Sequence, residues 1–182
     1  MIDFDHYTIR LLEVSDLIPY FELVERNRKR LEDFFTGTVS RTKDFAATEN
    51  FLKELTEKRS AKQYFPYVVV NHSTNVFVAF FDLKNIDWAI PKTEIGCYTD
   101  ENYAGKGMTT KAMKLFIDYC FDYFQFKKIF LRTHHTNKPA QIIAEKCGFE
   151  KEGIIRMDYK TTSGEIVDLI YYGKLNETNP IA

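Results

Sequence analysis

The sequence predicts an α/β (α+β) fold: a mixed, mostly antiparallel sheet of seven strands with helices on both faces. Segments rich in β-branched and aromatic residues are interleaved with segments whose apolar residues recur at helical spacing. Their order is one strand, two helices, three strands, a helix, a strand, a helix and two strands, which is typical of a sheet with helical cover. With 182 residues and 45% hydrophobic content, the chain is long enough for one domain with a sizeable core.

The first strand and the first helix follow each other at the N-terminus. His6 to Leu12 alternates in the manner of a strand. Ser15 then offers a helix N-cap, because its hydroxyl accepts a hydrogen bond from an unpaired backbone N–H group. The residues after it recur at i, i+3, i+4 and i+7, as one helix face requires: Leu17, Tyr20, Phe21 and Val24.

A break and a second helix come next. The run Gly-Thr-Val-Ser at residues 37–40 predicts a loop. The segment after it is amphipathic, and one of its faces is made of Thr48, Phe51, Leu52 and Leu55.

Three strands follow in the middle of the chain. Tyr67 to Val70 and Val76 to Leu83 are β-rich runs on either side of the turn-like residues His72 to Asn75. This pattern predicts an antiparallel hairpin. The next strand is Thr93 to Thr99.

The last third of the chain begins with a strand and a short helix. Lys128 to Thr133 has the composition of a buried strand. Apolar residues at helical spacing then mark a helix that Gly148 ends: Ala140, Ile143, Ala144 and Cys147.

Two further strands close the predicted sheet. They are about Phe149 to Lys160 and Ile166 to Lys174, joined by a hairpin tip at residues 161–164. Asn176 to Ala182 is expected to be a loose tail.

A glycine loop connects the predicted strand that ends at Thr99 to a helix. Gly105 and Gly107 stand immediately before apolar residues at helical spacing: Met108, Ala112, Leu115, Phe116, Tyr119 and Tyr123. A helix N-terminus presents unpaired N–H groups and a positive dipole end, and glycine lets a ligand approach them closely. The loop therefore predicts a cradle for a diphosphate.

Charge and composition exclude several classes of protein. Lys plus Arg total 25 against 26 Asp plus Glu, so a net charge of -1 supplies no general field for holding nucleic acid. No stretch approaches the ~18 apolar residues of a membrane span. The acidic N-terminus, residues 1–5, lacks the basic region of a signal peptide. We therefore expect no membrane partner and a cytoplasmic location.

The cysteines and histidines predict no metal site. Cys97, Cys120 and Cys147 show neither CxxC nor metal-ligand spacing, which indicates reduced core thiols. His134 and His135 are adjacent in a strand region, so their side chains point to opposite faces.

Four motifs, in this order, carry a family resemblance. They are the strand Glu94 to Tyr98, the loop Ala104 to Thr109, Asn137, and the run Glu145 to Gly153. With these spacings the chain resembles the GCN5-related N-acetyltransferase superfamily, especially its ribosomal-protein N-terminal acetyltransferase (RimL-type) branch. A glycine loop alone is weak evidence, whereas the four motifs together are specific.

The resemblance implies a single N-acetyltransferase domain over residues 1–182, with a core of about 7–175. It implies acetyl-coenzyme A (acetyl-CoA) as cosubstrate, bound where two parallel strands, Ile95 to Thr99 and Lys128 to Thr133, splay apart. Free strand groups would hold the pantetheine arm, and N–H groups of the loop would hold the diphosphate. The implied cofactor-binding residues are Cys97, Tyr98, Thr99, Ala104, Gly105, Lys106, Gly107, Met108, Thr109 and Asn137.

The loop departs from the family pattern at one position. Asn102 stands where the superfamily usually has Gln or Arg, although backbone donors dominate phosphate binding at such loops. Two basic runs, Arg28 to Arg30 and Lys127 to Lys128, are expected to be solvated faces, and one of them could pair with the 3′-phosphate of the cofactor.

For catalysis, the resemblance implies Glu94 as the general base, at the start of a strand where related enzymes often carry a carboxylate. The alternative for Glu94 is an edge carboxylate in an ion pair. Asp158 and Tyr159 lie near a second such position. The usual general acid is missing, because Ala144 replaces a tyrosine of many superfamily members and Ala140 a serine of many RimL-type enzymes. Coenzyme A, with a thiol pKa near ~8.5, is a fair leaving group without an acid.

Three functions remain open. The favoured one is an N-acetyltransferase that moves an acetyl group to a primary amine, foremost a protein N-terminal α-amine of ribosomal-protein type, by direct attack. Phe34, Phe35 and Trp88 would then either line the acceptor groove or pack in the core. The second is an acetyltransferase for a small amine such as a polyamine or an aminoglycoside, whose acidic groove would come from Asp33, Glu94, Asp100 and Glu101. The third is a non-catalytic acyl-CoA-binding module. The sequence is compatible with a monomer or an oligomer.

Overall fold

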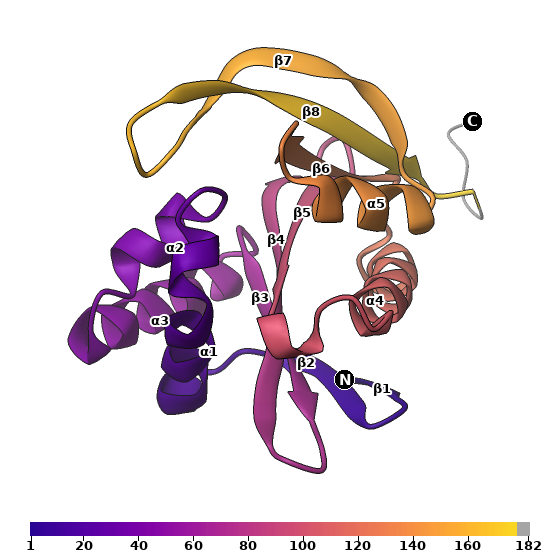
Figure 1. The fold of residues 1–182 in the computed structure, drawn as a ribbon. Helices are drawn as coiled ribbons and strands as arrows, with labels where there is room; N and C mark the ends of the chain where they lie inside the picture. Colours follow the sequence, from indigo (N-terminus) through magenta and orange to yellow (C-terminus); the bar gives the residue numbers. More distant parts are fainter. Residues whose placement is uncertain (178–182) are drawn as a thin grey trace.

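The computed structural model describes residues 1–177 and places them in one central sheet with helices on both sides (Figure 1). Within these residues the strands are β1 (Ile2–Phe4), β2 (Tyr7–Leu11), β3 (Phe65–Asn71), β4 (Val76–Asp87), β5 (Lys92–Thr99), β6 (Lys128–His134), β7 (Glu150–Lys160) and β8 (Ile166–Leu175). The α-helices are α1 (Leu17–Leu31), α2 (Thr36–Arg41), α3 (Phe45–Ser60), α4 (Met108–Phe124) and α5 (Lys138–Lys146). Two short 3-10 helices are η1 (Val14–Asp16) and η2 (Glu101–Tyr103).

The sheet has the strand order β1-β2-β3-β4-β5-β6-β8-β7, and each neighbouring pair is antiparallel except β5 and β6. The expected fold class, a mostly antiparallel mixed sheet with one parallel pair and helices on both faces, is confirmed. The sheet has one strand more than expected. Ile2–Phe4 turns back at Asp5, which has a φ of 48°, and pairs with β2. Three residues are too few to show a strand period.

The helices divide the core into two layers. On one face lie α4 and α5, and on the other lie α1, α2 and α3 (Figure 1). The buried ring of Phe116 on α4 lies 4.7 Å from Tyr67 and 5.4 Å from Phe81, centroid to centroid. On the opposite face, Tyr20 of α1 lies 5.5 Å from Phe80. Because β3 and β4 carry apolar residues toward both layers, they show continuous runs of buried residues rather than alternation.

The loop expected at residues 37–40 is wrong, because this run lies inside α2. Glycine and β-branched residues disfavour an isolated helix, so contacts outside the run must stabilise it. Arg28 of α1 donates to the carbonyl of Val39 at 3.2 Å, and the Thr36 backbone N–H at the start of α2 donates to the Tyr159 hydroxyl at 3.0 Å. Tertiary contacts have here overridden the local preference.

The N-cap expected at Ser15 is also wrong. Ser15 lies within η1, and α1 begins two residues later. The carboxylate of Asp16 accepts two hydrogen bonds from Arg10, at 2.7 and 2.8 Å, and one from the backbone N–H of Glu13 at 2.9 Å. This acid, rather than the serine hydroxyl, orders the start of the helix.

Asn176, the first residue of the expected loose tail, is instead held by two hydrogen bonds to the loop before β6. Its backbone N–H donates to the carbonyl of Lys127 at 2.9 Å, and its side-chain amide donates to the carbonyl of Phe126 at 3.2 Å. The tail residues 178–182 lie outside the described residues.

Between residues 1 and 177, none of the helices has the length and apolar character needed to cross a bilayer.

Replacing Phe116 by Ala should destabilise the fold strongly. The ring is fully buried between α4 and the sheet, so its loss removes apolar contacts and leaves a cavity, at a cost of about 3–5 kcal/mol in the free energy of unfolding. Chemical denaturation measures this. The matched control is Tyr123→Ala on the same helix, where the ring is 68% exposed and the cost should stay below about 1 kcal/mol. Equal losses in the two variants would contradict this description of the core.

Candidate active site

The parallel strands β5 and β6 pair over three residues and then separate. The paired positions are Lys92 with Lys128, Thr93 with Ile129, and Glu94 with Phe130. Beyond them β5 stays paired with β4 as far as Thr99, while β6 stays paired with β8 as far as His134. The sheet therefore opens into a notch between two strands whose facing N–H and C=O groups are available to a ligand.

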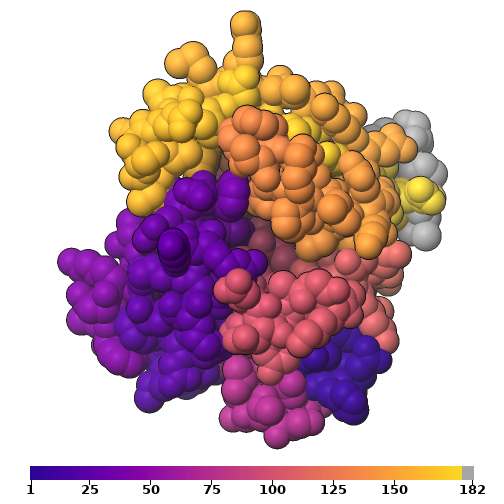
Figure 2. Space-filling view, viewed as in Figure 1, coloured from indigo at the N-terminus to yellow at the C-terminus, as the bar shows by residue number. Residues whose placement is uncertain are grey.

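A cavity of about 290 Å³ occupies this notch. In the space-filling view the surface is recessed where the N-terminal helices, the orange helix α5 and the pink segment around the start of α4 meet (Figure 2). The lining residues come from β4, β5, β6, α4, α5, β7, β8 and the segment after α1. The cavity therefore passes through the sheet and is lined by residues from both of its faces.

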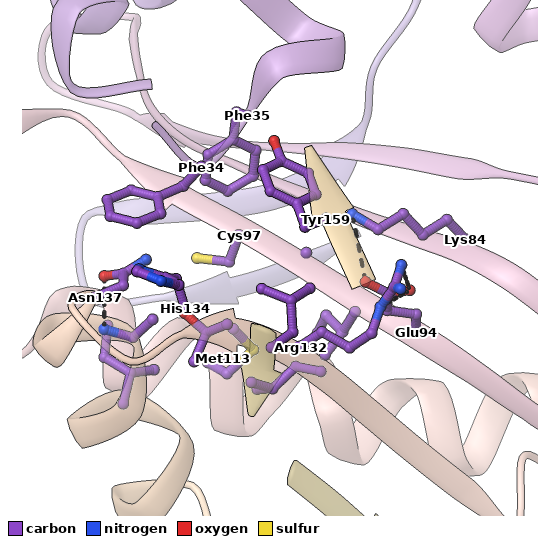
Figure 3. Close-up of a pocket in the computed structure, with 17 residues that line it drawn as sticks. Phe34, Phe35, Lys84, Glu94, Cys97, Met113, Arg132, His134, Asn137 and Tyr159 are labelled. Carbon is purple, nitrogen blue, oxygen red and sulfur yellow. Dashed lines mark hydrogen bonds and ion pairs between the residues drawn. The ribbon is translucent and has the colours of Figure 1, made fainter. Parts of the chain in front are cut away.

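The two sides of the cavity differ in chemistry because neighbouring residues of a strand point to opposite faces. Toward α4 and α5 it is mainly apolar, with Ile95, Cys97, Met113, Leu131 and Ile143. Toward α1 and α2 it is charged and aromatic, with Phe34, Phe35, Lys84, Glu94, Arg132 and Tyr159 (Figure 3). A ligand lying on the first side can therefore meet a second ligand on the other through the gap in the sheet.

The glycine loop forms the start of α4 at the edge of this notch. Gly105 and Gly107 have φ values of 74° and 83°, which residues with a side chain rarely adopt. A Cβ at either position would meet open space, so the glycines are needed for backbone conformation and leave the surface of the loop accessible. The hydroxyls of Thr99 and Thr109 lie 2.8 Å apart and connect the end of β5 to the first turn of α4. The N–H groups of that turn have no partner within the helix, so they can receive an anion, as the sequence predicted.

Asp100 holds the loop in place between the strand and the helix. It is 1% exposed and accepts a hydrogen bond from Arg26 at 2.7 Å. The backbone N–H and the side-chain amide of Asn102 donate to the same carboxylate, at 3.0 and 3.1 Å. Asn102, which stands where the family usually has Gln or Arg, therefore stabilises the conformation of the loop.

The predicted cofactor residues divide into three groups. Cys97 and Asn137 line the cavity, while Ala104 to Thr109 form the loop and the first turn of α4. The Asn137 side-chain oxygen accepts from Ala140 N–H at 3.3 Å and caps α5. The ring of Tyr98 points away from the apolar side and stacks 5.2 Å from Phe80. Tyr98 can thus offer a ligand its backbone, but its side chain belongs to the core.

Glu94 lies in the cavity wall within a network of charges. It is 5% exposed, and its Oε2 atom accepts from Asn85 at 2.6 Å and from the Arg132 guanidinium at 2.9 Å. Arg132 also donates to Asp158 at 2.9 Å. Lys84 Nζ lies 3.9 Å from the other Glu94 oxygen, Oε1. The expected base is therefore both at the cavity and ion-paired, and its Oε1 atom faces the fewer partners.

Sequence reasoning missed Lys84 and Arg132. Each is a cation that directly follows a run of apolar strand residues, broken in β4 only by Asp82, and this pattern is a signal that was available in the sequence. Lys84 lies opposite Glu94 in the register of β4 and β5, so the pairing of the strands brings the charges together.

The two alanines that replace the family's usual acids occupy different places. Ala140 lines the cavity, whereas Ala144 is fully buried in the core between α5 and the sheet. Cys97 supplies no replacement, because burial raises the pKa of its thiol far above the ordinary value. His134 lines the cavity and its Nδ1 atom lies 2.7 Å from the Thr136 hydroxyl.

The three aromatic residues that were expected either to line an acceptor groove or to pack in the core also occupy different places. Phe34 and Phe35 line the charged side of the cavity with Tyr159. Trp88 lies elsewhere: its ring stacks 5.4 Å from Phe126, and its indole N–H donates to the carbonyl of Lys62 at 2.9 Å. Among residues 1–177, no three His, Cys, Asp or Glu side chains are grouped so that they could hold a metal ion.

The apolar side of the cavity, next to the start of α4, joins its charged side through the gap between β5 and β6, and this arrangement suits a transferase with one substrate on each side. The chain belongs to the acetyltransferase (GNAT) domain family, whose sequence profile matches residues 6–150. The resemblance drawn from the four sequence motifs is confirmed.

Relatives of known or assigned function agree with this family. The chain is 27% identical to "Putative ribosomal N-acetyltransferase YdaF" of Bacillus subtilis, over 94% of this chain and 92% of that protein. A shorter match, 31% identical over 78 residues, covers 43% of this chain and 42% of a spermidine N(1)-acetyltransferase of Escherichia coli. The ribosomal-protein-S5-alanine acetyltransferase of Vibrio fischeri has the same fold, with a TM-score of 0.88, 24% identity and coverage of 97% and 96% of the two chains.

Acetyl-CoA is the cosubstrate of this enzyme, and structures of the same fold hold coenzyme A or acetyl-CoA. The described residues fit such a ligand. The apolar side of the notch suits a pantetheine arm, the free strand groups suit its amides, and the cradle at α4 suits the diphosphate.

Replacing Gly107 by Val should abolish the binding of coenzyme A while the protein remains folded. A β-branched residue is strained at a φ of 83°, so the loop must change its conformation and its N–H groups must turn away from the diphosphate. Titration calorimetry with coenzyme A measures the loss. Gly107→Asn is the matched control, because asparagine tolerates the left-handed region and should retain most of the affinity. Unchanged affinity in Gly107→Val would remove the diphosphate from this loop.

Proposed function

We propose that this acetyltransferase acts on protein N-terminal α-amines, in the manner of the ribosomal-protein enzymes. The observation that supports this proposal is the balance of charge on the charged side of the cavity, where the acceptor would bind. The only carboxylate among the described lining residues is Glu94, which lies between the cations Lys84 and Arg132. Because two cations and one carboxylate line this side of the cavity, it does not attract a polycation. It suits a single amine carried by a largely uncharged chain.

Apart from Glu94, the residues that were expected to form an acidic groove do not line the cavity. Asp33 and Glu101 are exposed and do not line the cavity. Asp100 is buried and paired with Arg26. Of the four residues expected to form an acidic groove, only Glu94 therefore lines the cavity, and its neighbours Asp82 and Asp158 are paired with Lys84 and Arg132.

The walls of the charged side of the cavity suit a peptide. Phe34 and Phe35 come from the segment after α1, and Tyr159 comes from β7. The Tyr159 hydroxyl donates to the Thr36 hydroxyl at 2.8 Å and accepts from the Thr36 backbone N–H at 3.0 Å. These contacts connect the β7–β8 hairpin to α2 above the cavity. Aromatic walls of this kind provide contact area for an N-terminal residue without demanding a charged side chain.

The chemistry requires a neutral amine at the thioester carbonyl. The nitrogen lone pair forms the C–N bond as the C–S bond breaks, and the electron pair of that bond leaves with sulfur. Glu94 accepts the amine proton through Oε1, directly or through a water molecule. Backbone N–H groups of β5 beyond Glu94 polarise the carbonyl oxygen of the acetyl group.

A small amine is the second candidate, because the E. coli spermidine N(1)-acetyltransferase shares a segment with this chain. The candidates are separated by supplying acetyl-CoA with ribosomal proteins, with peptides that copy their N-termini, with spermidine and with an aminoglycoside. Release of free thiol gives the rate, and mass spectrometry locates the acetyl group. We expect the α-amine of a protein or peptide to be preferred over spermidine by at least about tenfold in kcat/KM.

A preference for spermidine would contradict the proposed acceptor, and acetylation of lysine side chains alone would do the same. Binding of acetyl-CoA with no acetylation of any amine in the panel would instead favour the binding module that Ala140 and Ala144 first suggested.

Replacing Glu94 by Gln should lower kcat/KM by ~10²-fold or more and leave the affinity for coenzyme A nearly unchanged, because proton acceptance alone is lost. The fold should persist, since Arg132 keeps its contact with Asp158 and Lys84 its contact with Asp82. The pH–rate profile is the measurement, with Asp158→Asn as the matched removal of a carboxylate from the same network. If Glu94→Gln keeps the wild-type profile and Asp158→Asn loses it, the base is Asp158.

A further inference from the structure

The chain has no hydroxyl at the two positions from which its relatives usually meet the leaving sulfur. Ala140 faces the cavity without a polar group, and Ala144 lies in the core. The Tyr159 hydroxyl is engaged with Thr36. If the negative charge that develops on sulfur is stabilised by the protein, a different group must stabilise it.

Lys84 reaches the position where the strands separate. It lies on β4 directly opposite Glu94, the last β5 residue that pairs with β6. Its ammonium lies over Gly96, two residues further along β5, since a Cβ built there would be 2.8 Å from Lys84 Nζ. The same Cβ would overlap the carboxylate of Asp82. The absence of a side chain at residue 96 leaves room for this ammonium. Lys84 extends toward the cavity that it lines (Figure 3).

The ammonium is charged but not tightly paired. Lys84 Nζ lies 3.4 Å from Asp82 Oδ1 and 3.9 Å from Glu94 Oε1, which are long contacts for ion pairs. The other oxygens of these carboxylates have closer partners, because Tyr64 donates to Asp82 and Arg132 donates to Glu94. Lys84 thus keeps donor capacity for a ligand in the cavity that it lines.

The surrounding charges keep this lysine protonated. Burial works against the charge, and Arg132 also opposes it, but Asp82 and Glu94 outweigh both and raise the pKa of Lys84 above its ordinary value. Such an ammonium is too weak an acid to give its proton readily to a thiolate with a pKa near ~8.5. It can instead hold the thiolate by charge and a hydrogen bond.

We propose that the Lys84 ammonium stabilises the thiolate of coenzyme A as it leaves, and so replaces the hydroxyl that Ala140 and Ala144 lack. As the amine nitrogen bonds to the acetyl carbon, the C–S bonding pair moves to sulfur, and Lys84 donates a hydrogen bond to that anion without transferring its proton. The amine proton goes to Glu94 or to water, and the thiolate takes up a proton after release. This role rests on the proposed function insofar as the acetyl donor lies in the notch.

The test follows the thiol of bound coenzyme A, and it needs no acceptor. The absorbance of the thiolate is titrated with pH for coenzyme A bound to wild type, Lys84→Met and Lys84→Arg, after subtraction of each protein alone. We expect the pKa of the bound thiol to lie at least about one unit lower in wild type than in Lys84→Met. Lys84→Arg, which keeps the charge, should restore part of the shift.

Two controls separate this role from a structural one. Desulfo-coenzyme A lacks the sulfur, so its affinity should be the same for wild type and Lys84→Met, whereas coenzyme A above the thiol pKa should bind Lys84→Met about tenfold more weakly. Lys92→Met removes a lysine of β5 that does not line the cavity, and the thiol should titrate as in wild type.

The outcomes distinguish the two proposals. Equal thiol pKa values in wild type and Lys84→Met, with coenzyme A bound in both, would overturn the role of Lys84 and leave the acetyltransferase function intact. The same holds if desulfo-coenzyme A loses as much affinity as coenzyme A. Absence of coenzyme A binding to folded wild type would overturn the site itself.

Discussion

The divergence of β5 from β6 after Glu94 and Phe130 is the constraint on which the rest of the site depends. Backbone groups that leave a sheet inside a protein must find other partners, because an unpaired buried N–H or C=O group is costly. Here β5 remains bound to β4 and β6 remains bound to β8, so each strand is supported on its outer side only. The inner sides are left for a ligand rich in amides, and the two-sided cavity follows from that arrangement.

The charges on the charged side of the cavity are a second consequence of strand pairing. Asp82 and Lys84 of β4, Glu94 of β5, and Arg132 of β6 lie on one face because residues opposite each other in register share a face. Buried charges are tolerable only when they are paired, and these form pairs with one another and with Asp158. Gly96 leaves room for this group of side chains, which explains a glycine in the middle of a strand.

Much of the fold followed from local patterns, and the exceptions have physical causes. The strands other than β1 and the helix after Gly107 are visible in the sequence because period and glycine position are local properties. Residues 37–40 became helix through a hydrogen bond from Arg28, which no local pattern reveals. The partners of Glu94 depended on strand register, and a sequence without its sheet does not contain that information. The opposite directions of Cys97 and Tyr98 could have been foreseen, since adjacent strand residues face opposite sides.

The proposed role of Lys84 would let an acetyltransferase work without a hydroxyl on α5. A group on α5 would approach sulfur from the apolar side of the sheet, where a neutral hydroxyl is tolerated but a charged donor such as lysine would be costly to bury. Lys84 approaches from the opposite side, where Asp82 and Glu94 already hold its charge. A cation held in place before the reaction need not reorganise as negative charge develops, so it stabilises that charge more effectively than solvent. The alanines at residues 140 and 144 are then compatible with catalysis, because the compensating charge lies across the sheet.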